Sequence, residues 1–173
     1  MTPRLATLLL IILAAALFRI MPHPHNVTPI AAMALFAGAY LPSKRLALIV
    51  PLLAMLLSDL LLGLHSSMLY VYAGIALTVV IGFGLRQNPR VMPAIVASLM
   101  ASGLFFLVTN FGAWATSGIY PQTMEGLSMA YTAGIPFFRN SLLGDLFFTA
   151  VLFGGFQALE RISPSLGLSA KAS

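Results

Sequence analysis

The feature that most constrains this chain is a series of six apolar segments separated by short polar breaks. A helix needs about 20 residues to cross the hydrocarbon core of a bilayer, and most of the segments approach or reach that length. None shows the sustained period-2 alternation that a membrane β-barrel requires. The sequence therefore predicts an all-α integral membrane six-helix bundle, a single transmembrane domain over residues 1–173. The helices are expected at about 5–20, 28–41, 46–64, 68–85, 91–111 and 141–159.

Two of these segments leave alternatives open. The segment at 28–41 is short and rich in small residues, so it is either tilted in the membrane or packed inside the other helices. The segment at 5–20 also has the layout of a signal peptide, with Arg4 before an apolar run and three alanines at 14–16. Its cleavage would leave the orientation of the other five helices unchanged.

The composition excludes several classes of protein. Only 8% of the residues are charged and 60% are hydrophobic, whereas a soluble domain is roughly 25% charged. A chain this apolar cannot cover a water-facing surface, so it is not an ordinary soluble enzyme, a disordered chain or a nucleic-acid-binding module. It has no cysteine, which excludes a disulfide framework, a thiol nucleophile and a cysteine-ligated metal.

The basic residues predict the orientation of the bundle. With six spans both termini lie on one side, and the breaks on that side carry seven of the nine Lys and Arg residues, against two on the other. Because basic residues collect in cytoplasmic loops, both termini are expected in the cytoplasm, and the protein is expected as a multi-pass protein of the bacterial cytoplasmic (inner) membrane. The seven are Arg4, Lys44, Arg45, Arg86, Arg90, Arg161 and Lys171, and the two are Arg19 and Arg139.

The chemically varied residues fall on the predicted extracytoplasmic side. The largest piece there is the stretch 112–140, which contains Trp114, Tyr120 and Tyr131 and is expected to be a long loop. A loop longer than about 12 to 15 residues is usually functional or disordered, and this one is too aromatic to be disordered. Its aromatic residues form either an interfacial belt or a lid over a ligand.

Two acids lie inside apolar runs, Asp59 and Asp145. An acid in such a position usually faces the bundle interior or a water-filled cavity. The pair therefore indicates a substrate or ion site in the outer half of the bundle. The alternative is structural, with each acid in an ion pair with Arg19 or Arg139.

The histidines also allow two interpretations. His23 and His25 are two residues apart and could share a metal, but two ligands do not make a site, and both are also typical of a membrane–water boundary. His65 follows the segment at 46–64. It is either a cation at a helix C-terminus or an imidazole that faces a ligand and could coordinate a metal within it.

Four stretches carry a resemblance to a known family. They are the stretch from Met21 to Tyr40, which begins Met-Pro-His-Pro-His-Asn, Ser58 to His65, Thr109 to Trp114, and Pro136 to Asn140. Together they resemble a family of small bacterial six-helix membrane proteins. That family is similar to the substrate-binding S-components of energy-coupling-factor (ECF) vitamin transporters, in particular the cobalamin-type BtuM proteins. The likeness runs from about residue 19 to 156.

The resemblance implies a vitamin site under the extracytoplasmic loops, with cobalamin or a related corrinoid as bound substrate and no intrinsic cofactor. It adds an ECF transmembrane and ATPase module as a partner, although the chain could also act alone. Asp145 and Tyr70 complete the candidate set, and His65 is the possible ligand to a substrate-borne cobalt. The candidate substrate-binding residues are His23, Asn26, Asp59, His65, Tyr70, Asn110, Trp114, Tyr120, Arg139, Asn140 and Asp145.

Two departures from the family limit what the resemblance implies. BtuM-type proteins are associated with a cysteine that contacts cobalt, and this chain has none. The A-x-x-x-A signature with which the first helix of S-components docks its partner is also missing, because Ala6 and the three alanines at 14–16 do not give that spacing.

Three hypotheses for function follow. The first is that the protein binds and transports a small molecule, which predicts a cavity on the extracytoplasmic side. The second is an integral membrane enzyme acting on a lipid-like substrate, with Asp59, Asp145 and His65 within hydrogen-bond reach of a common point. The third is an assembly subunit that binds no ligand, in which Asp59 and Asp145 are fully paired with Arg19 and Arg139.

Overall fold

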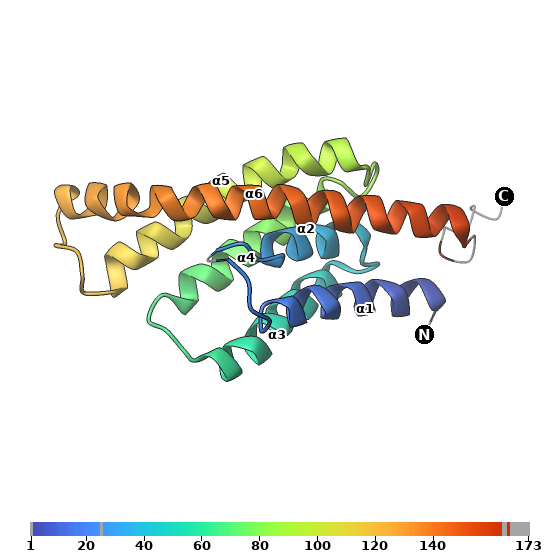
Figure 1. Cartoon of the computed structure of the whole chain (residues 1–173), viewed down its shortest axis with the longest axis horizontal. Coiled ribbons are helices and arrows are strands. Elements are labelled where there is room, and N and C mark those ends of the chain that lie inside the picture. The colour runs from blue at the N-terminus through green and yellow to red at the C-terminus, as the bar shows by residue number, and fades with distance from the viewer. Residues whose placement is uncertain (1, 25, 164–165, 167–173) are drawn as a thin grey trace.

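The computed structural model describes residues 2–24, 26–163 and 166, and over these residues it is helical apart from the connections. Successive helices run in opposite directions, so that α1 begins and α6 ends at the same end of the molecule (Figure 1). The predicted all-α bundle of six helices is confirmed for this part of the chain. The helices are α1 Pro3–Phe18, α2 Ile30–Tyr40, α3 Lys44–Leu62, α4 Met68–Phe83, α5 Val91–Thr116 and α6 Met124–Ile162.

Capping residues account for several of the helix limits. The Thr2 hydroxyl accepts a hydrogen bond from the backbone N–H of Leu5 and starts α1 at a proline. The Ser43 hydroxyl accepts one from the N–H of Leu46 and starts α3 two residues before its expected start. Gly63 ends α3 with a positive φ of 106°, a backbone conformation that favours glycine.

The prediction of a long loop at 112–140 is wrong. α5 continues to Thr116 and α6 already begins at Met124, so that only residues 117–123 connect them. The two helices form a hairpin that projects beyond the rest of the bundle, at the left in Figure 1. α6 begins there because the Thr123 hydroxyl accepts a hydrogen bond from the N–H of Gly126.

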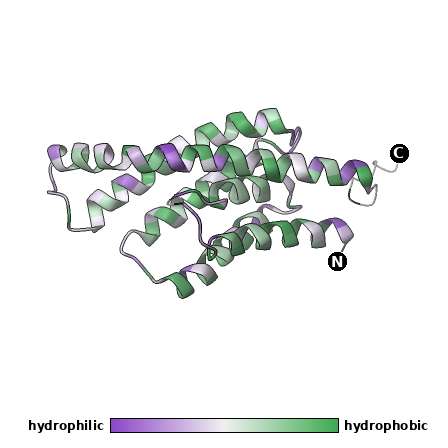
Figure 2. Ribbon diagram, viewed as in Figure 1, coloured by the Kyte–Doolittle hydropathy of each residue, from purple (hydrophilic) through white to green (hydrophobic). Residues whose placement is uncertain are grey.

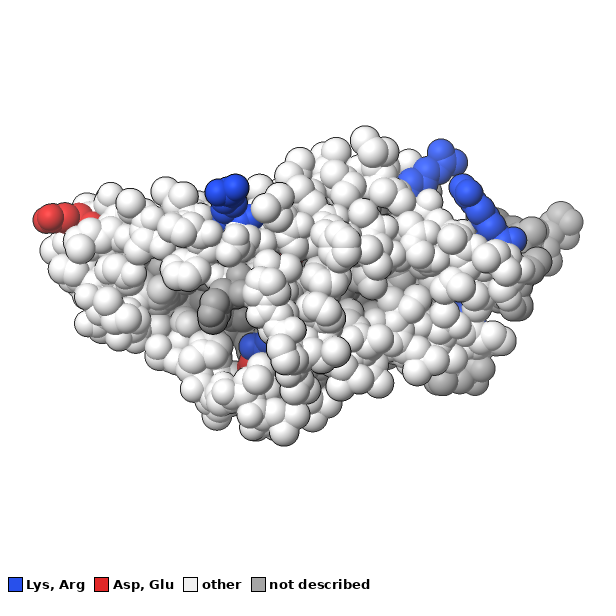
Figure 3. Space-filling view, viewed as in Figure 1, with Lys and Arg blue, Asp and Glu red and all other residues white. Residues whose placement is uncertain are grey.

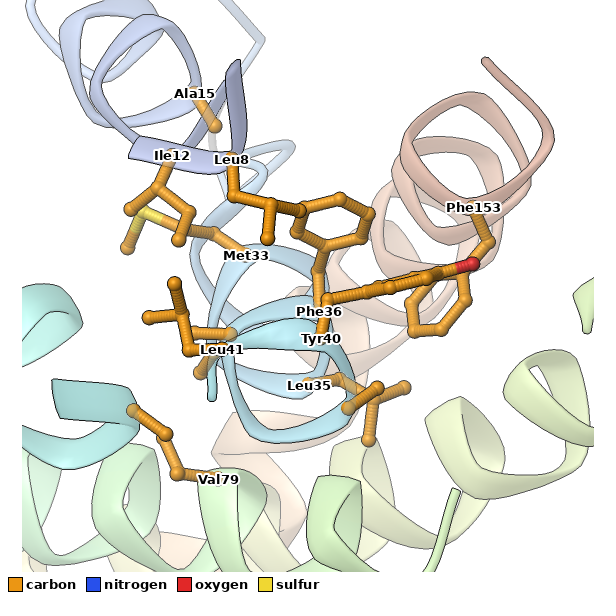
Figure 4. Packing of buried hydrophobic residues seen from close by; sticks show 14 of the residues in the cluster. Leu8, Ile12, Ala15, Met33, Leu35, Phe36, Tyr40, Leu41, Val79 and Phe153 are labelled. Atoms are coloured by element: carbon orange, nitrogen blue, oxygen red, sulfur yellow. The ribbon is translucent and has the colours of Figure 1, made fainter. Parts of the chain in front are cut away.

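α2 is the central helix of the fold. Ala31 to Tyr40 are all buried, and the helix packs against all five others. Of the two alternatives for this segment, packing inside the other helices is the one observed. Figure 4 shows Met33, Phe36 and Tyr40 of α2 reaching toward α1 and α6. With 11 residues, α2 is only about 16 Å long, half of what a membrane span requires.

The outer surface of the helices is apolar. Three helices, α3, α5 and α6, are long and apolar enough to cross a membrane, and α1, α2 and α4 are shorter apolar helices. Green covers most of the helical ribbon in Figure 2, with purple in the connections, at the start of α1, near the end of α6 and, most strongly, in the middle of α6. Leu61, Leu69 and Met92 are each more than 70% exposed, as expected for side chains that contact lipid.

Candidate functional site

A cavity of about 660 Å³ lies at the N-terminal end of α2, where Ile30 and Ala31 line it. The connection from α1 to α2 covers it, and α3, α4, α5 and α6 contribute Met55, Val71, Phe105 and Asp145 to its wall. Because α2 begins only at Ile30, it fills one half of the bundle and leaves this space in the other half. We call this space the main cavity.

The wall of the main cavity is largely apolar with a few polar groups, the usual composition of a small-molecule site. Its volume lies within the 300 to 1,000 Å³ that is common for such sites. Figure 3 shows a hollow on one face of the molecule, with basic and acidic atoms together at its depth. The polar side chains that line the main cavity are Arg19, His23, Asn26, Thr28, His65, Ser141 and Asp145.

One of the two intramembrane acids is held in an ion pair. Asp59 is completely buried, its carboxylate is paired with the guanidinium of Arg19, and its Oδ2 accepts a hydrogen bond of 2.8 Å from the hydroxyl of Tyr72. Arg19 also donates to the Ser58 hydroxyl at 2.6 Å. The ion-pair alternative is therefore observed for Asp59. Arg19 lines the main cavity but Asp59 does not, so Asp59 supports the wall from behind.

The second acid has a different environment. Asp145 is 6% exposed and lines the main cavity, and its Oδ2 lies 2.7 Å from the hydroxyl of Ser102. One turn further along α6, Thr149 donates to the hydroxyl of Ser98, which is a second polar contact between α5 and α6. Within the described residues no Lys, Arg or His lies within ion-pair distance of its carboxylate. The alternative of an ion pair with Arg139 is not observed.

A second cavity of about 240 Å³ lies between α5 and α6. It shares Asn26, Phe105, Ser141 and Asp145 with the main cavity, so the two spaces adjoin. Asn110, one of the predicted site residues, lines this second cavity, and its side-chain amide donates to the carbonyl of Phe106 at 2.8 Å.

Two of the three histidines line the main cavity, and His25 lies outside the described residues. Nδ1 of His23 lies 2.6 Å from the carbonyl oxygen of Met21; because a carbonyl only accepts, this nitrogen is the donor. Nδ1 of His65 lies 3.1 Å from the Ser67 hydroxyl. No group of three or more His, Asp or Glu side chains in the described part of the chain is arranged to hold a metal ion.

Besides Asp59, five predicted site residues line neither cavity. Trp114 lies near the tip of the α5–α6 hairpin, where its indole N–H donates to the carbonyl of Pro121 at 2.9 Å, and Tyr120 is in the connection at that tip. Tyr70 packs against Phe111 and Gly112 of α5. Arg139 and Asn140 are exposed on α6. The aromatic residues therefore stabilise the hairpin and do not cover the main cavity.

Sequence reasoning missed several lining residues. Ser102 follows Ala94 and Ser98 at four-residue spacing, a pattern of small residues that predicts only a helix contact face. Ser141 lies four residues before Asp145 and thus on the same helix face, a spacing that could have identified it. Phe105 reaches both cavities, but nothing in an apolar run distinguishes it from its neighbours.

Comparison with known proteins gives a family but no function. No curated protein and no solved structure matches the chain. The model of a family of unknown function, DUF6580, matches residues 1–166. With nearly the whole length matched, the chain belongs to the DUF6580 family.

Proposed function

We propose that this protein binds a small molecule in the main cavity and takes it up across the bacterial cytoplasmic membrane. The observation that carries the proposal is the 660 Å³ cavity inside an otherwise packed apolar bundle, lined by polar side chains from the α1–α2 connection, the α3–α4 connection and α6. A structural subunit without a ligand has no need of such a space, because unfilled volume in a core destabilises the fold.

The orientation supports capture from outside the cell. The positive-inside count favours cytoplasmic termini, and the main cavity lies toward the end of α1 that is remote from the N-terminus. In this orientation it opens in the extracytoplasmic half. Substrate would enter beside the α1–α2 connection, and release inward would follow reorientation of the bundle. An ATP-driven ECF module is one source of energy for that step, and action of the chain alone is the other.

The resemblance to cobalamin-type S-components supports a vitamin as substrate, with a corrinoid first. Because the chain has no cysteine, the group that would contact cobalt is an imidazole, and His65 lies on the cavity wall. A complete corrinoid is larger than a molecule of drug size, so its binding would require the α1–α2 connection to move outward.

The corrinoid proposal is tested by the visible spectrum of the purified protein after incubation with cobalamin and removal of free ligand. We expect a retained corrinoid band that His65→Ala weakens and Ser67→Ala preserves, because Ser67→Ala removes only the hydrogen-bond partner of the imidazole. A colourless wild-type protein would eliminate corrinoids.

The wider proposal of small-molecule binding has its own test. Val71 lines the main cavity, whereas Val80 of the same helix is 51% exposed to the outside. Val71→Phe should abolish retention of the small molecule that mass spectrometry detects in the gently purified protein, and Val80→Phe should not. If both variants retain it equally, the molecule is not bound in the main cavity.

The enzyme hypothesis has less support. It requires Asp59, Asp145 and His65 to act on a common point, but Asp59 is completely buried and engaged by Arg19 and Tyr72. Only Asp145 and His65 reach the main cavity. The assembly-subunit hypothesis explains the Asp59–Arg19 pair but not Asp145, whose carboxylate accepts a hydrogen bond from the Ser102 hydroxyl.

A further inference from the structure

The two charged side chains on the walls of the cavities, Arg19 and Asp145, differ in whether an opposite charge lies beside them. The guanidinium of Arg19, on the wall of the main cavity, is neutralised by Asp59 behind it. Asp145, on the wall of both cavities, has a hydroxyl partner and no cation within ion-pair distance among the described residues. A carboxylate in an apolar interior is normally paired. A cation bound in the space that Asp145 lines would supply the opposite charge.

The wall of the second cavity indicates what kind of cation fits there. Four phenylalanines line it, Phe105 and Phe106 from α5 and Phe137 and Phe138 from α6. The rings of Phe106 and Phe138 lie against each other, with centroids 4.7 Å apart. Aromatic faces attract cations, and cages of aromatic rings are a common way to bind alkylated ammonium groups.

The rest of the same wall is neutral. Its other polar side chains are Asn26, Ser102, Thr109, Asn110 and Ser141, so Asp145 is the only charged side chain among the residues that line the second cavity. A substituted ammonium group needs one counter-ion and apolar or aromatic surroundings for its alkyl groups. One carboxylate beside four phenylalanines meets that requirement.

We propose that the second cavity binds an organic cation through an alkylated ammonium group, with Asp145 as its counter-ion and the phenylalanines as its wall. The inference rests on the wider proposal of small-molecule binding and uptake, and it names a substrate class other than the corrinoids. Because the cavities share Asn26, Phe105, Ser141 and Asp145, the cationic group occupies the second cavity and the remainder of the molecule extends into the main one.

The test compares a cation with a neutral molecule of the same shape. Choline and 3,3-dimethylbutanol differ in having nitrogen or carbon at the centre of three methyl groups, and therefore in charge. Titration calorimetry on the full chain in detergent should show choline binding at millimolar concentration or better. The neutral analogue should bind at least about tenfold more weakly. Equal binding of the two, or no binding of choline and tetramethylammonium at millimolar concentration, would overturn the inference.

Variants locate the site. Asp145→Asn removes the charge with little change in shape and should reduce choline affinity at least about tenfold. Glu125→Gln removes the same charge from an exposed position on the same helix and should leave it unchanged. If Asp145→Asn does not fold, Phe138→Leu keeps an apolar wall without a ring. That variant should weaken choline and not the neutral analogue, and equal affinity of wild type and Phe138→Leu for choline would count against the aromatic wall.

Failure of this inference can be told apart from failure of the proposed function. If the purified protein retains a neutral small molecule that Val71→Phe displaces, the protein binds small molecules and only the cation inference is wrong. If choline binding is lost in Asp145→Asn yet no transport of any bound molecule into vesicles is seen, the cation site stands and uptake does not.

Discussion

The two halves of this bundle are built from the same helices but are packed in opposite ways. In the half that contains α2, the rings of Phe36 and Tyr40 meet those of Phe153 and Phe156 of α6, mostly at steep angles (Figure 4). All four side chains are buried. The other half contains two cavities and two buried acids, Asp59 and Asp145. The difference arises from the length of α2, which is too short to fill both.

The packed half is also closed at its end by polar contacts. Arg86 donates to the carbonyls of Gly38 and Leu41, each at 3.0 Å, and so satisfies groups that the C-terminus of α2 leaves free. At the opposite end α2 starts with no side-chain cap, beside the main cavity. The side chains of the packed half therefore stabilise the fold. The other half contains cavities and polar groups that stability does not require.

The largest expected effect tests this contrast directly. Phe36→Ala should lower the free energy of unfolding by about 4 kcal/mol, because Phe36 is completely buried among aromatic rings. Phe105→Ala, which removes the same atoms from the wall of the cavities, should cost clearly less. Unfolding measured in the same detergent for both variants provides the comparison, and equal losses would contradict a packed and an open half.

The second effect concerns the ion pair behind the cavity wall. Asp59→Asn leaves Arg19 facing a neutral amide in an apolar interior and should cost about 3 kcal/mol, the usual loss when one partner of a buried pair is removed. Combining it with Arg19→Gln should recover part of the loss, since no unpaired charge then remains. Thermal unfolding of the single and double variants measures this, and a double variant less stable than either single variant would argue that the two residues act independently of their charge.

The general architecture could be predicted from the sequence because it depends on hydropathy. Runs of apolar residues and the breaks between them are local features, and the six helices follow from them. The prediction of a loop at 112–140 is wrong because the polar and aromatic residues there indicate a loop, whereas the spacing of the small residues indicates a helix. Gly126, Ala130 and Gly134 recur every four residues and form the buried face of α6, a pattern typical of a helix packed closely on another.

The site could be predicted only where a residue conflicts with its surroundings. Asp59 and Asp145 stand out because acids are expensive in apolar segments, and both proved to be buried. The sequence could not distinguish their roles, because the partners come from distant positions: Arg19 lies 40 residues from Asp59 in the chain, and Ser102 lies 43 residues from Asp145. Trp114 and Arg139 are equally unusual in type, yet neither lines a cavity.

A third test examines how closely α2 is held in the packed half. A Cβ atom on Gly38 would lie 2.3 Å from the carbonyl oxygen of Val79 and 2.9 Å from the Cα of Gly82, both backbone atoms that cannot rotate away. Gly38→Ala should therefore cost about 2 kcal/mol, although alanine is normally the better helix former. Gly155→Ala, where nothing lies within 4 Å, should be neutral or slightly stabilising in the same unfolding experiment. If the two variants behaved alike, α2 and α4 would not be in backbone contact.

The smallest effect is expected at the tip of the α5–α6 hairpin, outside both halves. Trp114→Phe keeps the ring contact with Phe111 and removes the indole N–H that donates to the carbonyl of Pro121. Loss of one such bond should lower stability by about 1 kcal/mol or less. Because Trp114 lines neither cavity, ligand binding should be unchanged. If Trp114 were part of an aromatic lid, the variant would instead lose ligand affinity markedly, with little change in stability. Measuring both ligand affinity and unfolding of this variant therefore separates a residue that supports the hairpin from one that covers a ligand.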